Sequence, residues 1–450
     1  MDTDALRSAV RDGMPRTIDE LSRLVTIPSI GYPGYDPANV RASAELAAQI
    51  FRDAGVPDVR LLELEGGHPA VYGEVPGPAG SPTILLYAHH DVQPAGDESA
   101  WSSPPFQPEV RAGRLYGRGA ADDKSGIVVH AAALRALLAA GPLPCTVRLL
   151  VEGEEECTAE HLPQLVGGNA DLLRADVAII ADGGNERTGL PTIGTSVRGS
   201  TAVEVRVDVL PIAVHSGAYG GPLPDAITAL ARIIASLHDE RGNITLEGLH
   251  AFTWTGRPMP EDDFRDETRV FPEVQLLGEG TIADRVLAKP SVNVLAFESV
   301  DVRDAANQIV PTARAVIGLR IPPGEDPTRA QAILVDHLRA AVPWGVRATF
   351  SPGDPSPGYL VDESTPAYAV SAEALTEAFG VEAVAIGSGG SIPLVPMLAD
   401  TFPGIQVLIL GAGDHVSNYH SIDESVDLAD LEKLALAETL LIRRLGAPVA

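Results

Sequence analysis

The chain has 450 residues, of which 45% are hydrophobic and 21% are charged, and its formal net charge is −28. This length exceeds what one ordinary hydrophobic core fills, so we expect two domains. Such a negative surface repels phosphate backbones, which argues against nucleic acid as a partner. The two cysteines, Cys145 and Cys157, are too few for a disulfide framework.

The first twenty residues, MDTDALRSAVRDGMPRTIDE, are too polar for a secretory signal peptide. No apolar run along the sequence is long enough to span a bilayer, so we expect no membrane partner. A cytoplasmic location is therefore the prediction.

Helices and strands are predicted in turn along the first part of the chain. Apolar residues at helical spacing mark three segments: 16–25, 40–55 and 125–141. Short apolar runs typical of buried strands mark three others: 82–88, 145–153 and 175–184. Strands that alternate with helices indicate a mostly parallel sheet with flanking helices.

The pattern changes near residue 197. Residues 200–210 alternate with a period near two, as in a half-exposed antiparallel strand, and residues 225–240 predict an amphipathic helix. After a long irregular stretch, two more strands are predicted: 291–297 and 313–324. One helix and several strands with an open face indicate a small α+β domain.

Alternation of helix and strand returns from about Asp326. We therefore predict an α/β domain made of residues 1–196 and 324–450. A smaller α+β domain, residues 197–323, interrupts it.

Four groups of acidic or imidazole residues each follow a predicted strand. They are His89 and Asp91 in AHHD, Asp122 in GRGAADDK, Glu155 and Glu156 in EGEEE, and Asp182 in AIIAD. Loops at the carboxyl ends of parallel strands are where open α/β sheets build their sites. Together with a late His420, these side chains suit a hard or borderline cation bound through oxygen and nitrogen.

Each group also has a simpler explanation. A polar turn after a strand accounts for His89, and a glycine-rich turn that caps the next helix accounts for Asp122. A solvated acidic turn accounts for residues 152–156, and a plain strand end accounts for Asp182.

Six motifs resemble, in order along the chain, those of the M20 metallopeptidases. The motifs are YAHHDVQP, LYGRGAADDKSG, EGEEECT, ADGG, AVHSG and NYHSIDE. That family includes dipeptidases, carnosinases, carboxypeptidases, aminoacylases and desuccinylases. The resemblance implies a di-metal catalytic domain, an inserted lid and a homodimer formed through that lid.

The resemblance also implies a role for each matching residue. Two divalent metal ions would bind as follows: His89 and Asp182 on one, Glu156 and His420 on the other, and Asp122 on both. The catalytic residues would be Asp91, which orients His89; Glu155, the general base; and His215, supplied by the partner's lid. The substrate's terminal carboxylate would bind four residues: Asn293, Arg320, Gly390 and Ser391. Zinc is the expected metal, with manganese and cobalt as alternatives.

Two of these roles have plain alternatives, since His215 also suits a surface turn and Arg320 also suits a charge on the lid surface.

The resemblance implies a metal-dependent hydrolase that cleaves dipeptides or short peptides. An N-acyl amino acid deacylase of the same family would use the same metals with another acyl pocket. An alternative of a different class is a catalytically silent, metal-stabilised binding protein, which is expected to lack Glu155 or a ligand.

Overall fold

The computed structural model describes residues 3–157 and 160–447, and the chain divides into two compact units. The first unit lies within Met1–Thr195, Val361–Ile386 and Ile392–Ala450, and the second within Ser196–Leu360 and Gly387–Ser391. No helix among the described residues is both long enough and apolar enough to cross a bilayer.

A nine-stranded sheet forms the centre of the first unit, with the order β1-β2-β6-β3-β7-β17-β8-β15, and β16 pairs with β8. The strands are β1 (Asp58–Leu62), β2 (Ala70–Val75), β3 (Thr83–His89), β6 (Thr146–Glu152), β7 (Val177–Ile180), β8 (Thr192–Val197), β15 (Tyr359–Leu360), β16 (Val384–Gly387) and β17 (Gln406–Ile409). A small second sheet has the order β18 (Ser425–Asp427), β5 (Arg114–Tyr116) and β4 (Glu109–Arg111).

The central strands of the large sheet are parallel. Strand β3 pairs in parallel with β6 and β7, and β7 pairs in parallel with β17, whereas β1, β2 and β15 pair antiparallel towards the margins. Strands β3 and β7 are buried almost throughout, as expected where helices cover both faces. The predicted α/β class with a mostly parallel sheet is therefore confirmed.

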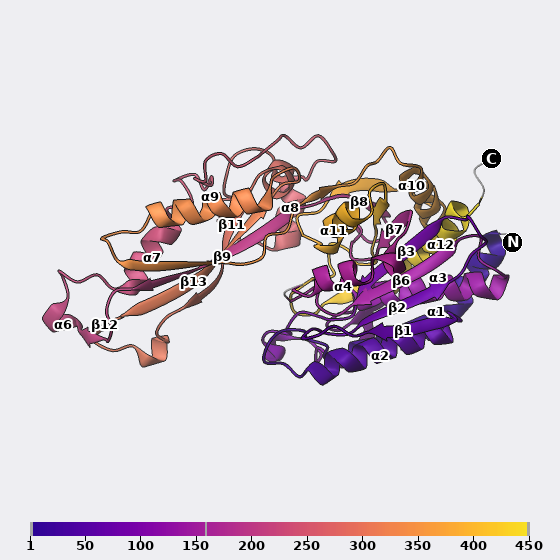
Figure 1. Ribbon diagram of the computed structural model, residues 1–450, viewed down its shortest axis with the longest axis horizontal. Helices are drawn as coiled ribbons and strands as arrows, with labels where there is room; N and C mark the ends of the chain where they lie inside the picture. Colours follow the sequence, from indigo (N-terminus) through magenta and orange to yellow (C-terminus); the bar gives the residue numbers. More distant parts are fainter. Residues whose placement is uncertain (1–2, 158–159, 448–450) are drawn as a thin grey trace. The chain divides into compact units, whose positions relative to one another are not determined.

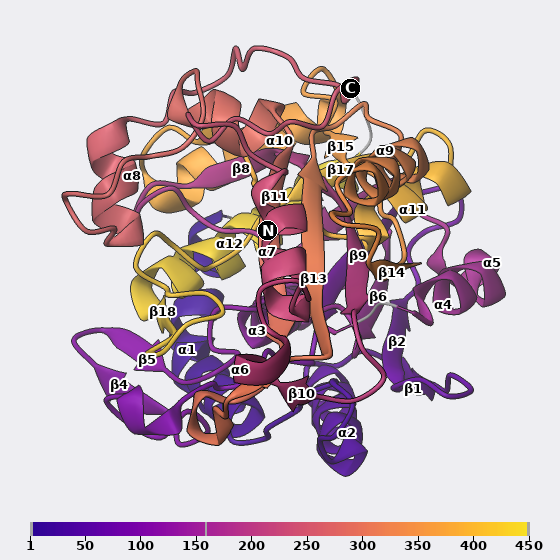
Figure 2. The ribbon, with the colours of Figure 1, turned by 90° about the vertical axis from the view of Figure 1, so that its left-hand side faces the viewer.

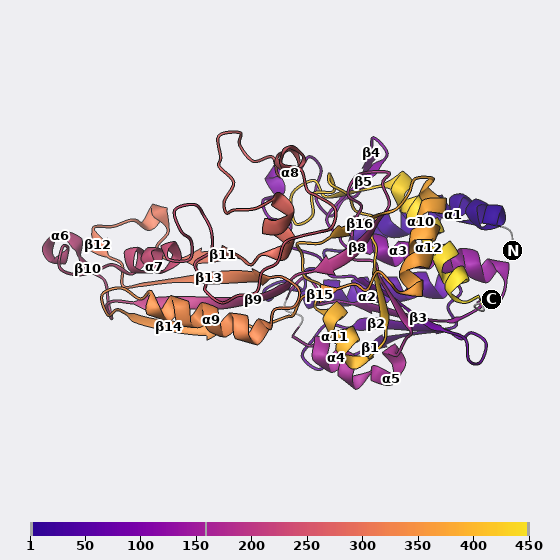
Figure 3. The same ribbon diagram turned by 90° about the horizontal axis from the view of Figure 1, so that it is seen from above.

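Helices cover this sheet in two layers (Figure 1). One layer packs into the main hydrophobic core: α1 (Thr3–Val25), α2 (Pro37–Asp53), α3 (Lys124–Ala140), α10 (Pro366–Phe379) and α12 (Leu428–Leu445). The others are α4 (Leu162–Gly168), α5 (Ala170–Leu173) and α11 (Leu394–Thr401), which Figure 3 shows grouped on the other side of the strands. A short 3-10 helix spans Glu98–Ala100.

Helix α1 is longer than its predicted segment, because it runs from Thr3 through Pro15 without a break. Its extra turns bury Leu6, Val10 and Met14 at helical spacing in the core. Burial of this stripe stabilises the helix in spite of the backbone hydrogen bond that a proline removes.

The second unit is a four-stranded antiparallel sheet, in the order β11-β13-β9-β14, with helices on one face. Its main elements are β9 (Gly199–Asp208), α7 (Ala226–Ala235), β11 (Ser291–Glu298), β13 (Thr312–Ile321), α9 (Pro327–Ala340) and β14 (Arg347–Pro352). Figure 2 shows α7 beside β13, and α7 and α9 share one hydrophobic core with β9 and β13.

Smaller elements complete the second unit. They are β10 (Val214–His215) paired with β12 (Gln308–Ile309), α6 (Ser216–Tyr219), α8 (Glu261–Thr268), a π-helix at Asp284–Ala288 and a 3-10 helix at Val302–Asp304. The long irregular stretch predicted before residue 290 contains only α8 and this π-helix.

The predicted inserted domain, residues 197–323, ends too early. Strand β14 pairs with β9, and α9 packs on the same sheet, so residues up to Leu360 belong to the second unit. The local pattern of a helix followed by a strand is the same in both units, and only the pairing partner of β14 separates them.

Candidate metal centre

Strands β3, β6 and β7 end at the same edge of the sheet and carry the first predicted ligands there. His89 is the last residue of β3 and lies in register with Glu152 at the end of β6. Asp182 follows the end of β7 at Ile180, and β7 is paired in parallel with β3. The parallel register therefore brings together side chains far apart in the sequence.

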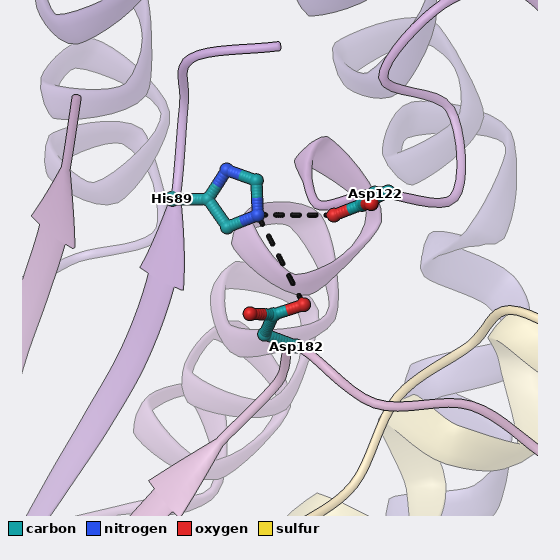
Figure 4. Close-up of side chains that lie close together, drawn as sticks. All are labelled: His89, Asp122 and Asp182. Atoms are coloured by element: carbon teal, nitrogen blue, oxygen red, sulfur yellow. Dashed lines mark hydrogen bonds and ion pairs between the residues drawn. The ribbon is translucent and has the colours of Figure 1, made fainter. Parts of the chain in front are cut away.

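His89, Asp122 and Asp182 form one group of candidate metal ligands (Figure 4). The Nε2 atom of His89 lies 3.0 Å from Asp122 Oδ1 and 4.0 Å from Asp182 Oδ1. On the other side of the ring, Nδ1 faces Asp91, at 3.2 Å from its carbonyl oxygen and 3.4 Å from its carboxylate. Asp91 therefore orients the ring so that Nε2 points at the two carboxylates.

Asp122, Glu156 and His420 form a second group. His420 Nε2 lies 3.1 Å from Asp122 Oδ2 and 3.2 Å from Glu156 Oε2. The two carboxylate oxygens of Asp122 thus face different histidines, His89 and His420. A carboxylate placed in this way can bridge two cations.

The turn that carries Asp122 is held by Glu424, which is fully buried. Its carboxylate accepts hydrogen bonds from the backbone N–H groups of Gly119, Ala121 and Asp122, at 2.9, 2.9 and 3.0 Å. The buried Arg118 guanidinium donates to the same carboxylate at 2.8 Å. These contacts position the backbone of the turn.

The glutamates of residues 152–156 make different contacts. Glu152 accepts a hydrogen bond from Tyr87 at 2.6 Å, and Glu154 pairs with His161 at 3.0 Å. Only Glu155 and Glu156 remain for the centre itself. Residues 152–156 therefore do not form a single solvated acidic turn.

Burial and neighbouring charges strongly shift the pKa values of side chains in the candidate metal centre. Burial alone lowers the pKa of His420, yet its hydrogen bonds to Asp122 and Glu156 raise it to about 10. Burial and the nearby Asp182 charge raise the pKa of Glu155 well above its ordinary value.

Asp182 behaves in the same way, since burial raises its pKa well above the usual range although His89 opposes the shift. Crowded carboxylates that hold protons in this way would be relieved by divalent cations, so the donor set fits a metal pair.

The predicted substrate residues lie in the second unit. Arg320 on β13 donates a 2.6 Å hydrogen bond to Ser391 Oγ, which itself donates to the Arg198 carbonyl. Gly390 accepts a hydrogen bond from the Arg198 N–H. The structure therefore brings Arg320, Ser391 and Gly390 into one cluster.

Asn293 lies on β11, on the same face of the sheet as Arg320. Arg320 is paired with Ser291, and Asn293 is two residues further along that strand. Side chains two residues apart on a strand point to the same face, so Asn293 and Arg320 are diagonal neighbours. Both are exposed.

His215 also lies in the second unit, at the start of the short helix α6. Its ring is exposed, and Nδ1 accepts a hydrogen bond from the Ala218 N–H at 3.1 Å. This contact accounts for a turn histidine and leaves Nε2 available for another role.

The sequence motifs by themselves indicate no role for Glu424, although NYHSIDE contains it, or for Gln93 of HHDVQP. Gln93 donates to Glu156 Oε2 at 2.7 Å and thus belongs to the surroundings of the centre. A possible signal was position, since each residue lies within four positions of a predicted ligand.

Comparisons with known proteins show which family and which solved structures this chain is similar to. The family model for peptidase family M20/M25/M40 matches residues 85–444. The cysteinylglycine-S-conjugate dipeptidase of Corynebacterium striatum is 39% identical over 371 residues, which cover 81% of this chain and 82% of that protein.

Two solved structures share the fold over almost their full lengths. Human carnosine dipeptidase 1 has a TM-score of 0.87 at 20% identity, with 99% of this chain and 98% of that chain covered. The metallo-carboxypeptidase Sso-CP2 of Sulfolobus solfataricus has a TM-score of 0.85 at 25% identity, with 95% and 99% covered. The family match spans most of the chain and includes every candidate ligand, and the chain therefore belongs to peptidase family M20/M25/M40.

Proposed function

We propose that the protein is a dipeptidase that uses two divalent metal ions, with zinc expected and manganese or cobalt as alternatives. The observation that carries the proposal is the pair of ligand groups that share Asp122, beside the half-buried Glu155. His89 and Asp182 would hold one ion, Glu156 and His420 the other, and Asp122 both. When bound, the ions supply a water of lowered pKa and polarise the scissile carbonyl.

The chain's own residues would move the protons. Glu155, whose pKa is raised by burial and by Asp182, is suited to accept a proton at its carboxylate and to pass it to the leaving amine. Asp91, at 3.4 Å from His89 Nδ1, would keep that ring in the orientation and protonation state that a ligand needs.

The substrate would be held by its terminal carboxylate. Arg320 presents a planar guanidinium that pairs with both oxygens of a carboxylate, and Ser391 fixes its position. Asn293, on the same face of the sheet, and Gly390 would add polar contacts. The dipeptidase names of the Corynebacterium striatum relative and of the human structural neighbour support dipeptides as the substrate class.

The inserted unit would serve as a lid and as the dimer interface. Strand β11 is an edge strand whose side chains Val294, Leu295 and Phe297 are exposed, which is typical of a strand that pairs with another chain. In such a homodimer His215 would stabilise the developing oxyanion in the partner's site. A cytoplasmic location stays a prediction.

The test is hydrolysis of a mixed panel by the metal-loaded protein beside Glu155→Gln. The panel holds cysteinylglycine, an S-alkyl cysteinylglycine, β-alanyl-histidine, a tripeptide and several N-acyl amino acids. We expect dipeptide cleavage by the wild type, and at least a 100-fold loss in Glu155→Gln with both metals still bound. The carboxamide keeps the size of the side chain and removes only its basicity.

The pattern of turnover separates the alternatives. Cleavage of N-acyl amino acids alone would make the protein a deacylase of the same family. Absence of turnover with every substrate and metal would leave the silent binding protein. Dipeptide cleavage that survives in Glu155→Gln would overturn the role of Glu155.

A further inference from the structure

Residues of the turn that follows β3 form several hydrogen bonds with Glu156. Gln93 Nε2 donates to Glu156 Oε2 at 2.7 Å and to the Glu156 backbone carbonyl at 3.1 Å. The Asp91 carboxylate accepts the Glu156 backbone N–H at 3.0 Å. One amide group bonded to both the side chain and the backbone of Glu156 restricts that side chain to a single orientation.

Gln93 is itself oriented from the other side. The Tyr32 hydroxyl donates to Gln93 Oε1 at 3.2 Å, and both side chains are half-buried. Because the amide oxygen is occupied by Tyr32, the amide nitrogen faces Glu156. Tyr32, Gln93 and Glu156 therefore form a directed chain of hydrogen bonds.

This chain ends on one half of the candidate metal centre. Glu156 Oε2 lies 3.2 Å from His420 Nε2, so the oxygen that Gln93 holds is the one that faces the second ligand group. Within the described residues, no hydrogen bond joins Gln93 to His89, Asp122 or Asp182.

The choice of a carboxamide matters for a cation site. Gln93 donates hydrogen bonds without a positive charge, so it holds the carboxylate and does not compete with a metal ion. Partners that orient a metal ligand from outside typically contribute a factor of about 10–100 in metal affinity.

We propose that Gln93, oriented by Tyr32, is a positioning residue that sets the occupancy of one metal position, the one that includes Glu156 and His420. This inference rests on the proposed two-metal function and deepens it. The position that includes His89 and Asp182 is unaffected by Gln93.

The test is a titration of the metal-free full-length protein with Co²⁺, followed by calorimetry and by visible absorption. The wild type should bind two ions in two resolvable steps. Gln93→Met keeps the length of the side chain and removes its hydrogen bonds, and it should weaken one step about 10–100-fold. Tyr32→Phe should weaken the same step by a smaller factor.

Two further variants identify the affected step. Asp182→Asn should weaken the other step, with a different change in the absorption of bound Co²⁺. Gln49→Met, at an exposed glutamine on α2 that donates to Asp53, should leave both steps unchanged. Circular dichroism and the thermal midpoint of each variant establish that the fold is retained.

The outcomes are distinct. Equal weakening of both steps, or no weakening, in Gln93→Met and Tyr32→Phe would overturn the inference while the two-metal proposal stands. A wild-type protein that binds only one ion would overturn the proposed function and this inference with it. If Gln93→Met does not fold, the Co²⁺ titration of Tyr32→Phe alone tests the inference.

Discussion

Glu424 holds Asp122 directly: its carboxylate accepts the Asp122 backbone N–H at 3.0 Å, although the two residues lie 302 positions apart in the sequence. His420 lies four residues before Glu424 in the same segment, which therefore carries both a proposed ligand and the group that positions the shared one. Glu424 thus couples two ligands of the proposed second metal position.

Glu424→Gln should weaken both metal positions and destabilise the fold. The amide nitrogen would face Arg118 or a backbone N–H, so a donor would meet a donor in a fully buried place. Breaking such a pair costs about 3–5 kcal/mol. Urea unfolding and metal titration measure the two effects, with the exposed Glu382→Gln as the charge-matched control. An unfolding midpoint equal to that of the wild type would contradict the assignment.

Metal binding should release protons. His420 has a pKa of about 10 in the metal-free protein, so near pH 8 its ring is still protonated and must lose that proton to act as a ligand. The raised pKa values of Asp182 and Glu155 act in the same direction. Release should therefore fall as the pH rises through these values.

Calorimetry in buffers of different ionisation enthalpy measures the number of protons. His420→Gln should release fewer protons than the wild type near pH 8. Binding of two ions at that pH without proton release would contradict the electrostatic description of the centre.

The buried pair of His130 and Glu438 should make stability depend on pH. His130 Nδ1 lies 2.8 Å from Glu438, and Nε2 lies 3.0 Å from the Tyr87 carbonyl, so both ring nitrogens face acceptors. Burial lowers the pKa of His130, but the charge and hydrogen bond of Glu438 outweigh it and raise the pKa.

The pKa of His130 in the folded protein lies above the ordinary value of about 6.5. The pair therefore contributes its full stabilisation of the fold below a pH of about 6.5. This contribution is lost as the pH rises through the folded pKa. Glu438→Gln should lower the free energy of unfolding by about 3–5 kcal/mol near pH 6 and by less near pH 9. A loss in urea unfolding that is equal at both pH values would contradict the ionised pair.

Replacing Arg320 should raise KM more than it lowers kcat, because the proposed contact with the terminal carboxylate would be made in both the ground and transition states. A hydrogen bond to a charged group contributes about 1.5–3 kcal/mol, which corresponds to a rise in KM of about 10–150-fold for Arg320→Met. A dipeptide amide, which lacks the carboxylate, should be insensitive to the change. Arg314→Met, at an exposed arginine on the same strand, is the matched control.

Mixing two inactive variants should restore activity if His215 acts across a dimer. A mixed dimer of Glu155→Gln and His215→Gln holds one site with both defects and one site with neither. Random exchange then restores about a quarter of the sites. Each variant alone should stay inactive, and mixtures that remain inactive after verified subunit exchange would contradict the role in trans.

The central strands of the fold were predictable because they are buried on both faces and read as short apolar runs: residues 82–88, 145–153 and 175–184 match β3, β6 and β7. The end of the inserted unit was not predictable. Strand β14 belongs there only through its pairing with β9, and no local pattern encodes a pairing partner.

The candidate ligands were predictable because they recur in short motifs at strand ends. Their supports were not. Glu424 lies in the NYHSIDE motif, but no side-chain pattern shows that it binds backbone N–H groups, and Tyr32 meets Gln93 across 61 positions. Contacts of this kind depend on the tertiary fold, so they are visible only in the structure.

The place of β17 in the sheet has a consequence during synthesis on the ribosome. Residues up to 195 already contain β3, β6 and β7, but β17, which covers the free edge of β7, is made only after the whole inserted unit. Until then β7 presents an apolar edge, a surface that chaperones and proteases recognise. His420 emerges later still. A prematurely terminated chain therefore lacks one member of the second ligand group.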